Sequence, residues 1–196
     1  MTGKQVFLKW LYPFTMQMGK WLSEKKNIQI NAHFIKPTTS FYDLQAVNNA
    51  GTVVHFSEWE AKKVLIVNTA SFCGFTAQYA ELQKLYDLYP SKLIILAFPS
   101  NDFKEQEPDT NAQIAQFCSL NYGVQFLLMQ KSVVVKSEMQ HPVFQWLSNA
   151  DKNGWNNQAP VWNFNKYLVN ESGILTHYFS SFISPLSPQM KAAIEQ

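Results

Sequence analysis

Apolar residues form short runs and periodic segments in this chain from Ser40 onward. Two continuous apolar runs, VLIVNTA from Val64 and LIILAF over residues 93–98, are typical of strands buried on both faces of a sheet. Between them, apolar and aromatic residues recur at helical spacing over residues 77–89, which predicts an amphipathic helix. The order strand, helix, strand indicates an α/β fold.

Turn-forming residues mark two hairpins and a closing helix. FYDLQAV and TVVHF flank the turn at residues 48–51, and KYLVN and ILTHYF flank the turn at residues 171–173. The last helix is expected to start at Ser187-Pro188, a suitable cap and first-turn pair. These elements predict a three-layer sandwich in which helices flank a central mixed β-sheet.

The first 39 residues differ from the rest of the chain. Residues 1–22 are rich in aromatic and aliphatic side chains, and residues 23–40 are polar and are interpreted as a connector. We therefore expect an N-terminal helical extension and connector over residues 1–39 and one domain over residues 40–196. The extension has neither the length of apolar sequence needed to span a bilayer nor a signal-peptide cleavage site.

The extension could still form an interfacial helix on a membrane surface, with lysines at its flanks, or a helix docked on the domain itself. We accordingly expect a cytoplasmic protein that could associate peripherally with a membrane through this extension. The side chains that would share the apolar face of that helix are Phe7, Leu11, Phe14 and Met18.

Composition narrows the classes of partner. The 196 residues carry a formal net charge of +2, and every basic residue is a lysine, scattered singly or in pairs. Nucleic-acid binding is therefore unexpected, since no block of positive charge could follow a phosphate backbone. The histidines lack ligand spacing, so we predict no metal. They are His33, His55, His141 and His177.

Two cysteines, Cys73 and Cys118, are too few for a disulfide-stapled scaffold and form either one redox couple or two free thiols. Cys73 follows the first buried strand, where a helix is expected to begin. Free N–H groups and the helix dipole would favour its thiolate there. No second cysteine lies nearby in a C-x-x-C arrangement. Cys73 is thus either a single nucleophile, oxidised to a sulfenic acid and resolved elsewhere, or a small buried hydrophobe.

Three motifs follow one another along the chain: ASFCGFT, AFPSNDFKEQEP and APVWNFNKYLVNESG. With these motifs in the expected order, the chain from about Ser40 to its end resembles the glutathione peroxidase family, a branch of the thioredoxin-like fold. The resemblance implies a peroxidase that protects against oxidative stress. It also implies four residues around the peroxide, each of which would be unremarkable alone: Cys73, Gln106, Trp162 and Asn163.

The chemistry explains this choice of residue types. A thiolate attacks one peroxide oxygen, and the other oxygen leaves with growing negative charge. Amide and indole N–H groups can stabilise both the sulfur and the leaving oxygen without introducing a competing charged base.

The chain also departs from the family pattern. Where the family commonly has Phe-Pro-Cys-Asn-Gln-Phe, residues 98–103 read Phe-Pro-Ser-Asn-Asp-Phe. Ser100 removes a thiol, and Asp102 adds a carboxylate that is expected to oppose ionisation of the nucleophile. The four site residues themselves are unchanged.

The resemblance also bears on the reductant. Glutathione-dependent members rely partly on arginines around the pocket, and this chain has none. Many other members use a second cysteine in the helix after the QEP loop and are recycled by thioredoxin. That helix, capped by Asp109 or Thr110, would carry Cys118 on its inner face beside Ile114 and Phe117. Cys118 is therefore either the resolving residue or an inert core cysteine.

The leading hypothesis is a thiol peroxidase that reduces hydrogen peroxide and organic hydroperoxides, recycled by thioredoxin rather than glutathione, without a bound cofactor. The resemblance also implies a monomer, because tetrameric members of the family carry an extra loop ahead of the WNF motif and the corresponding segment here, residues 141–161, is short. Two alternatives remain. One is a peroxide sensor that passes its disulfide to partner proteins, and the other is a membrane-surface adaptor that docks through residues 1–39.

Overall fold

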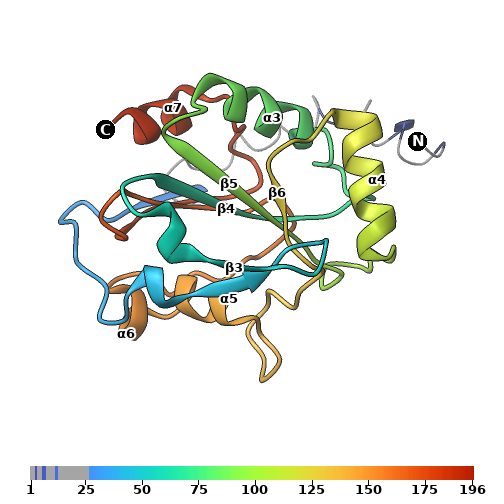
Figure 1. Ribbon diagram of the computed structural model, residues 1–196. Coiled ribbons are helices and arrows are strands. Elements are labelled where there is room, and N and C mark those ends of the chain that lie inside the picture. The colour runs from blue at the N-terminus through green and yellow to red at the C-terminus, as the bar shows by residue number, and fades with distance from the viewer. Residues whose placement is uncertain (1–2, 4–5, 8–11, 13–26) are drawn as a thin grey trace.

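The computed structural model describes Gly3, Val6, Phe7, Tyr12 and residues 27–196. A six-stranded mixed sheet runs through its centre in the order β1-β8-β7-β4-β5-β6 (Figure 1). The strands β4, β5 and β6 are parallel, whereas β7, β8 and β1 continue the sheet in antiparallel pairs. Their bounds are β1 Ile28–Ile30, β4 Lys63–Thr69, β5 Leu93–Pro99, β6 Leu127–Leu128, β7 Lys166–Val169 and β8 Leu175–Phe179.

Helices cover both faces of this sheet, which confirms the predicted three layers. Side chains of α3 (Gln78–Leu88), α4 (Asn111–Tyr122) and α7 (Pro188–Glu195) pack in one buried cluster. A second cluster lies on the opposite face (Figure 1). It is covered by α5 (Pro142–Leu147), the hairpin of β2 (Gln45–Val47) and β3 (Val53–His55), and the short helices η1 (Phe41–Asp43) and η2 (Phe56–Trp59), with α6 (Ala150–Asn153) beside α5.

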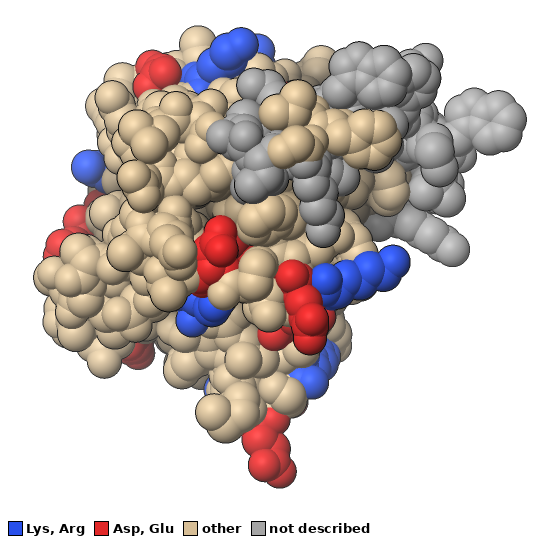
Figure 2. Space-filling model, turned by 90° about the vertical axis from the view of Figure 1, so that its right-hand side faces the viewer, with Lys and Arg blue, Asp and Glu red and all other residues tan. Residues whose placement is uncertain are grey.

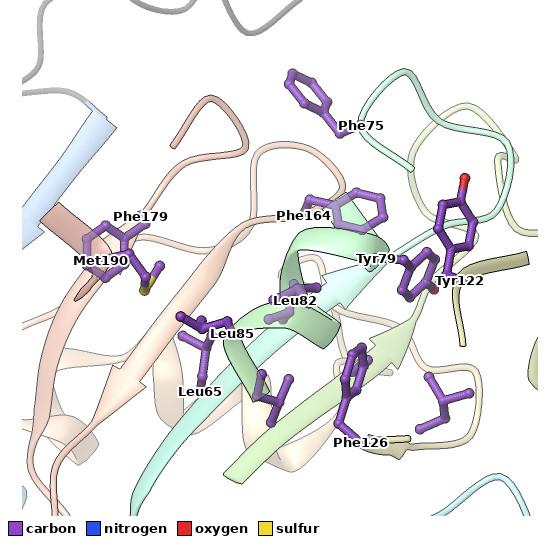
Figure 3. Close-up of a cluster of buried hydrophobic side chains, with 14 of the residues drawn as sticks. Leu65, Phe75, Tyr79, Leu82, Leu85, Tyr122, Phe126, Phe164, Phe179 and Met190 are labelled. Atoms are coloured by element: carbon purple, nitrogen blue, oxygen red, sulfur yellow. The ribbon is translucent and has the colours of Figure 1, made fainter. Parts of the chain in front are cut away.

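The central strand β4 explains why its sequence is apolar without interruption. Leu65 and Val67 enter the first cluster, and Val64 and Ile66 enter the second, because alternate side chains of a strand point to opposite faces. Leu65 lies beneath the side chains of α3 in the first cluster (Figure 3). A strand covered on both sides places its carboxyl end, and the loop that follows, at a fixed position.

The helix ends follow the predicted chemistry. Thr110, rather than Asp109, caps α4, and its hydroxyl and the Gln113 side chain form a capping box. The Ser187 hydroxyl accepts from the Met190 N–H at the start of α7, with Pro188 at the first helical position. On α4, Cys118 is fully buried as expected.

The N-terminal part differs from the prediction in one respect. The connector predicted over residues 23–40 contains a strand, β1, which pairs with β8 through Ile28–Phe179, Gln29–Tyr178 and Ile30–His177. A three-residue edge strand carries no periodic signal of its own, because it is specified by its partner. The sheet thus begins before Ser40.

Of the predicted interfacial helix, Leu11, Phe14 and Met18 lie outside the described residues. Tyr12 packs against the first cluster, and its hydroxyl donates to Glu81 Oε1 of α3 at 2.8 Å. Phe7 is 58% exposed. Among the described residues, no helix has the length and apolarity that crossing a membrane requires.

Candidate active site

Cys73 lies in the loop between β4 and α3 and is fully buried. Thr76 holds this loop: its hydroxyl accepts from the Cys73 N–H at 3.0 Å and lies 2.7 Å from the Cys73 carbonyl and 2.9 Å from the Ala70 carbonyl. The helix α3 begins only at Gln78. The prediction that Cys73 opens the helix is therefore wrong, because the intervening residues form successive turns instead.

The surroundings of the Cys73 sulfur act in opposite directions on its ionisation. Burial raises the pKa of the thiol, because a thiolate loses its hydration there. The Phe75 N–H, 3.5 Å from Sγ, and the side chains of Trp162 and Asn163 lower the pKa by hydrogen bonding. Burial prevails, so the pKa is raised and the expected thiolate at ordinary pH is not a property of this closed conformation.

The other predicted site residues are linked to Cys73 by hydrogen bonds, either directly or through a neighbour. Asn163 is fully buried, and its Nδ2 donates to Gln106 Oε1 at 3.1 Å. The Gln106 carbonyl accepts from the Phe72 N–H at 3.0 Å, which ties the QEP loop to the residue preceding the thiol. The four side chains named by the motifs thus come from three separate segments: Trp162 and Asn163 act directly on the Cys73 sulfur, and Gln106 reaches it only through Asn163.

A strained turn presents Trp162 and Asn163. Phe164, which follows them, has φ of 66°, a left-handed conformation that costs a non-glycine residue on the order of 1 kcal/mol. Hydrogen bonds maintain it: the Phe164 N–H donates to the Asn68 carbonyl, Asn68 Nδ2 donates to the Trp162 carbonyl, and Ser181 Oγ donates to the Asn163 carbonyl at 2.6 Å. The ends of β4 and β8 therefore fix the turn from both sides.

The loop that carries Gln106 contains two further left-handed residues, Lys104 at φ 53° and Glu105 at φ 52°. This backbone places the Lys104 ammonium 5.6 Å from the centroid of the Trp162 ring, and the Phe103 ring lies 5.7 Å from the same residue. Sequence reasoning missed Lys104, since nothing in the string FKEQEP shows that its side chain turns back over the tryptophan.

The carboxylate of Asp102 has a different role from the one expected. Its Oδ2 accepts from the N–H groups of Val134 and Val135 at 2.6 and 3.1 Å. The side chain thus holds the loop after β6 in place through two backbone hydrogen bonds. The expectation that it acts on Cys73 finds no support among the groups that shift the pKa of that thiol.

The second thiol, Cys118, is also fully buried and free, within the same apolar cluster as Cys73. Burial raises the pKa of Cys118 to about 12, and the Glu107 charge contributes to the rise, while the Tyr79 hydroxyl opposes it. Sequence reasoning also missed Glu107, whose burial no local pattern indicates. Among the described residues, no three His, Cys, Asp or Glu side chains form a group that could hold a metal ion.

The face of the molecule that includes α4 carries no continuous positive patch among the described residues in view. Figure 2 shows lysines and acidic residues interspersed across it. Association with a polyanion needs several positive charges along one track, and this face does not provide them.

Comparison with known proteins agrees with the geometry. The profile of the glutathione peroxidase family matches residues 41–148. Glutathione peroxidase-like peroxiredoxin 2 of Saccharomyces cerevisiae is 43% identical over 151 residues, covering 76% of this chain and 93% of that protein.

Two solved structures extend the comparison. The apo crystal structure of Trgpx superimposes with a TM-score of 0.62 at 32% identity, covering 81% of this chain and 97% of that one. A thiol:disulfide interchange protein of the thioredoxin family from Chlorobium tepidum gives a TM-score of 0.56 at 11% identity, covering 82% of this chain and 97% of that one. At that identity the likeness concerns the fold alone, which is thioredoxin-like.

Proposed function

This chain belongs to the glutathione peroxidase family, and from that premise we propose that it is a thiol peroxidase that reduces hydrogen peroxide and organic hydroperoxides through Cys73. One observation carries the proposal. The Asn163 amide, linked to Gln106 at 3.1 Å, and the Trp162 side chain both hydrogen-bond toward the Cys73 sulfur. Together with the Phe75 N–H, 3.5 Å from Sγ, they place three neutral donors around one thiol, which suits a reaction that moves negative charge from sulfur to oxygen.

The first step would proceed as follows. The Cys73 thiolate attacks one peroxide oxygen, the O–O bond breaks, and the departing alkoxide or hydroxide takes up a proton. Cys73 becomes a sulfenic acid. Because Cys73 is closed off from solvent, its loop must open before peroxide enters. Entry of water with the substrate would remove part of the burial that now raises the pKa of the thiol.

We further propose that Cys118 resolves the sulfenic acid and that thioredoxin reduces the resulting disulfide. Cys118 is the second thiol of the chain and shares a buried cluster with Cys73. Since it lies within α4, the helix must unwind locally to bring the sulfurs to disulfide distance. Glutathione fits less well, because no arginine is present to hold its carboxylates.

The test is peroxide consumption by the purified protein with thioredoxin, thioredoxin reductase and NADPH, compared with glutathione and glutathione reductase. Turnover is expected with thioredoxin and is expected to disappear in Cys118→Ser. Inactivity with both reductants would refute the peroxidase. Equal turnover of Cys118→Ser and the unaltered protein would refute the resolving role of Cys118. Mixed disulfides with other proteins, detected by mass spectrometry after brief peroxide treatment, would instead favour a sensor.

A further inference from the structure

A buried carboxylate contacts the loop of one thiol, interacts electrostatically with the other thiol and takes no part in the chemistry described above. Glu107 is fully buried, and its Oε2 accepts from the Ser71 hydroxyl, in the loop of Cys73, at 3.1 Å. Its backbone N–H donates to Asn101 Oδ1 at 2.8 Å, which fixes the residue in place. The second carboxylate oxygen, Oε1, is buried and has no hydrogen-bond partner among the described residues. An acid side chain held in this way is rare without a function.

Glu107 also lies within electrostatic range of Cys118. The two groups interact electrostatically, and the Tyr79 hydroxyl interacts with both of them. The Tyr79 ring lies 5.6 Å from the ring of Tyr122, one turn of α4 beyond Cys118 (Figure 3). The Thr69 hydroxyl, at the end of β4, also acts on Tyr79. The atoms Thr69 Oγ1 and Tyr79 OH are buried and, like Glu107 Oε1, lack a hydrogen bond of normal geometry.

This arrangement bears on the resolving step. Attack on a sulfenic acid requires a thiolate, yet burial keeps the Cys118 thiol neutral, with a pKa raised to about 12. Burial also raises the pKa of Glu107, to about 7, against the lowering effect of Ser71 and of the Lys131 ammonium. The remaining charged group that faces it, Asp109, acts in the same direction as burial. A base that titrates near neutrality is ionised at the working pH and can take the proton as the thiol attacks.

We propose that Glu107 accepts the proton of Cys118, through the Tyr79 hydroxyl, when Cys118 resolves the Cys73 sulfenic acid. The inference rests on the proposed role of Cys118. The Cys118 S–H proton moves to the Glu107 carboxylate as the Cys118 sulfur attacks the Cys73 sulfur. The S–S bond forms, the S–O bond of the sulfenic acid breaks, and the departing hydroxide takes the proton from Glu107 as water. The carboxylate is regenerated, and no further reactant is needed.

The experiment follows the two steps separately in the full-length protein. Reduced protein is mixed with one equivalent of hydrogen peroxide. Sulfenic acid is trapped with dimedone, and the Cys73–Cys118 disulfide is followed by mass spectrometry of acid-quenched samples. In Glu107→Gln, sulfenic acid should form within threefold of the normal rate. Disulfide formation should slow at least tenfold at pH 7.5. The rate of disulfide formation in the unaltered protein should rise with pH through about 7, and this inflection should vanish in the variant.

Three further variants separate chemistry from folding. Glu105→Gln removes the same charge from an exposed neighbour in the same loop and should leave both rates and the pH profile unchanged. Glu107→Asp retains a carboxylate and should restore the inflection. Tyr79→Phe leaves Glu107 intact and tests the relay if Glu107→Gln folds poorly, as judged by circular dichroism. It should slow disulfide formation and not sulfenic acid formation.

The outcomes distinguish the two proposals. If the unaltered protein forms sulfenic acid but no Cys73–Cys118 disulfide, the resolving role of Cys118 fails and this inference falls with it. If the disulfide forms in Glu107→Gln at the normal rate and with the same dependence on pH, the role of Cys118 stands and only the role of Glu107 is refuted.

Discussion

The two cysteines are equally buried, yet their surroundings differ in kind. Around Cys73, the Phe75 N–H and the Trp162 and Asn163 side chains point neutral donors at the sulfur. Around Cys118, a capped helix holds the thiol beside a tyrosine and a carboxylate. Neutral donors favour a negative sulfur, whereas a nearby carboxylate disfavours one until it accepts the proton. Burial alone therefore does not distinguish a nucleophile from a thiol that must be activated.

The largest expected effect comes from removing each sulfur in turn. Cys73→Ser should abolish peroxide reduction, with a loss of at least about a thousandfold, because hydroxyl oxygen is far less nucleophilic than thiolate. Cys118→Ser should still consume one equivalent of peroxide at the normal rate in a single turnover and then stop. Stopped-flow measurement with stoichiometric peroxide checks both. Equal single-turnover rates in the two variants would erase the distinction between the thiols.

The next effect tests the donors around Cys73. Gln106→Ala should lower kcat/KM for peroxide on the order of a hundredfold, because the Asn163 amide loses the oxygen that accepts its hydrogen bond and is no longer held toward the sulfur. Stability should change little, since Gln106 is only half-buried. Gln116→Ala, on the exposed side of α4, is the matched control and should behave normally. A loss below threefold would count against the role of Gln106.

Stability as a function of pH tests the surroundings of Cys118. The pKa of Glu107 is raised from 4.5 to about 7 in the folded protein, so its favourable contribution is complete below about 4.5 and is lost as pH rises through about 7. Glu107→Gln should therefore gain up to about 3 kcal/mol of unfolding free energy relative to the unaltered protein at pH 8, and little at pH 4. Urea denaturation at both pH values measures it. If the variant and the unaltered protein differ in unfolding free energy by the same amount at both pH values, burial does not destabilise the ionised carboxylate.

The smallest effect concerns the cation over Trp162. Lys104→Gly should stabilise the fold by about 0.5–1 kcal/mol, because glycine tolerates φ of 53°. It should also lower kcat/KM by less than about fivefold, the value of an exposed cation–π contact. Lys104→Gln loses the cation and keeps the strain, so it should lower activity without the gain in stability. If both variants are fully active, Lys104 plays no part in orienting the tryptophan.

Much of the fold follows from local patterns, whereas the ionisation of the site does not. The apolar run of β4 predicts a strand with two buried faces, and Thr110 and Ser187 sit where capping chemistry requires. The motifs name four side chains that the structure brings together. No local pattern reveals that Cys73 is sealed from solvent, because its burial depends on segments distant in sequence.

The strand β1 likewise could not be predicted from local sequence. Its three residues lie in a polar stretch, and only their pairing with β8 makes them extended. The burial of Glu107 is likewise invisible in the string QEP, where an acidic residue between two polar or turn-forming neighbours is typical of an exposed loop. In both cases the deciding contacts come from segments far away in the chain.

The pairing of β1 with β8 sets a boundary for protein engineering. The Ser180 N–H and hydroxyl both bond to Asn27, and the next residue, Ser181, holds the carbonyl of Asn163. A shortened protein that starts at Ser40 would lack the edge strand β1 and the hydrogen bonds from Ser180 to Asn27. The segment that holds Asn163 would then be less fixed, and the exposed edge of β8 could pair with another copy of the chain. A shortened protein that starts at Asn27 keeps β1 and these hydrogen bonds, so it is the appropriate variant for measuring what the preceding residues contribute.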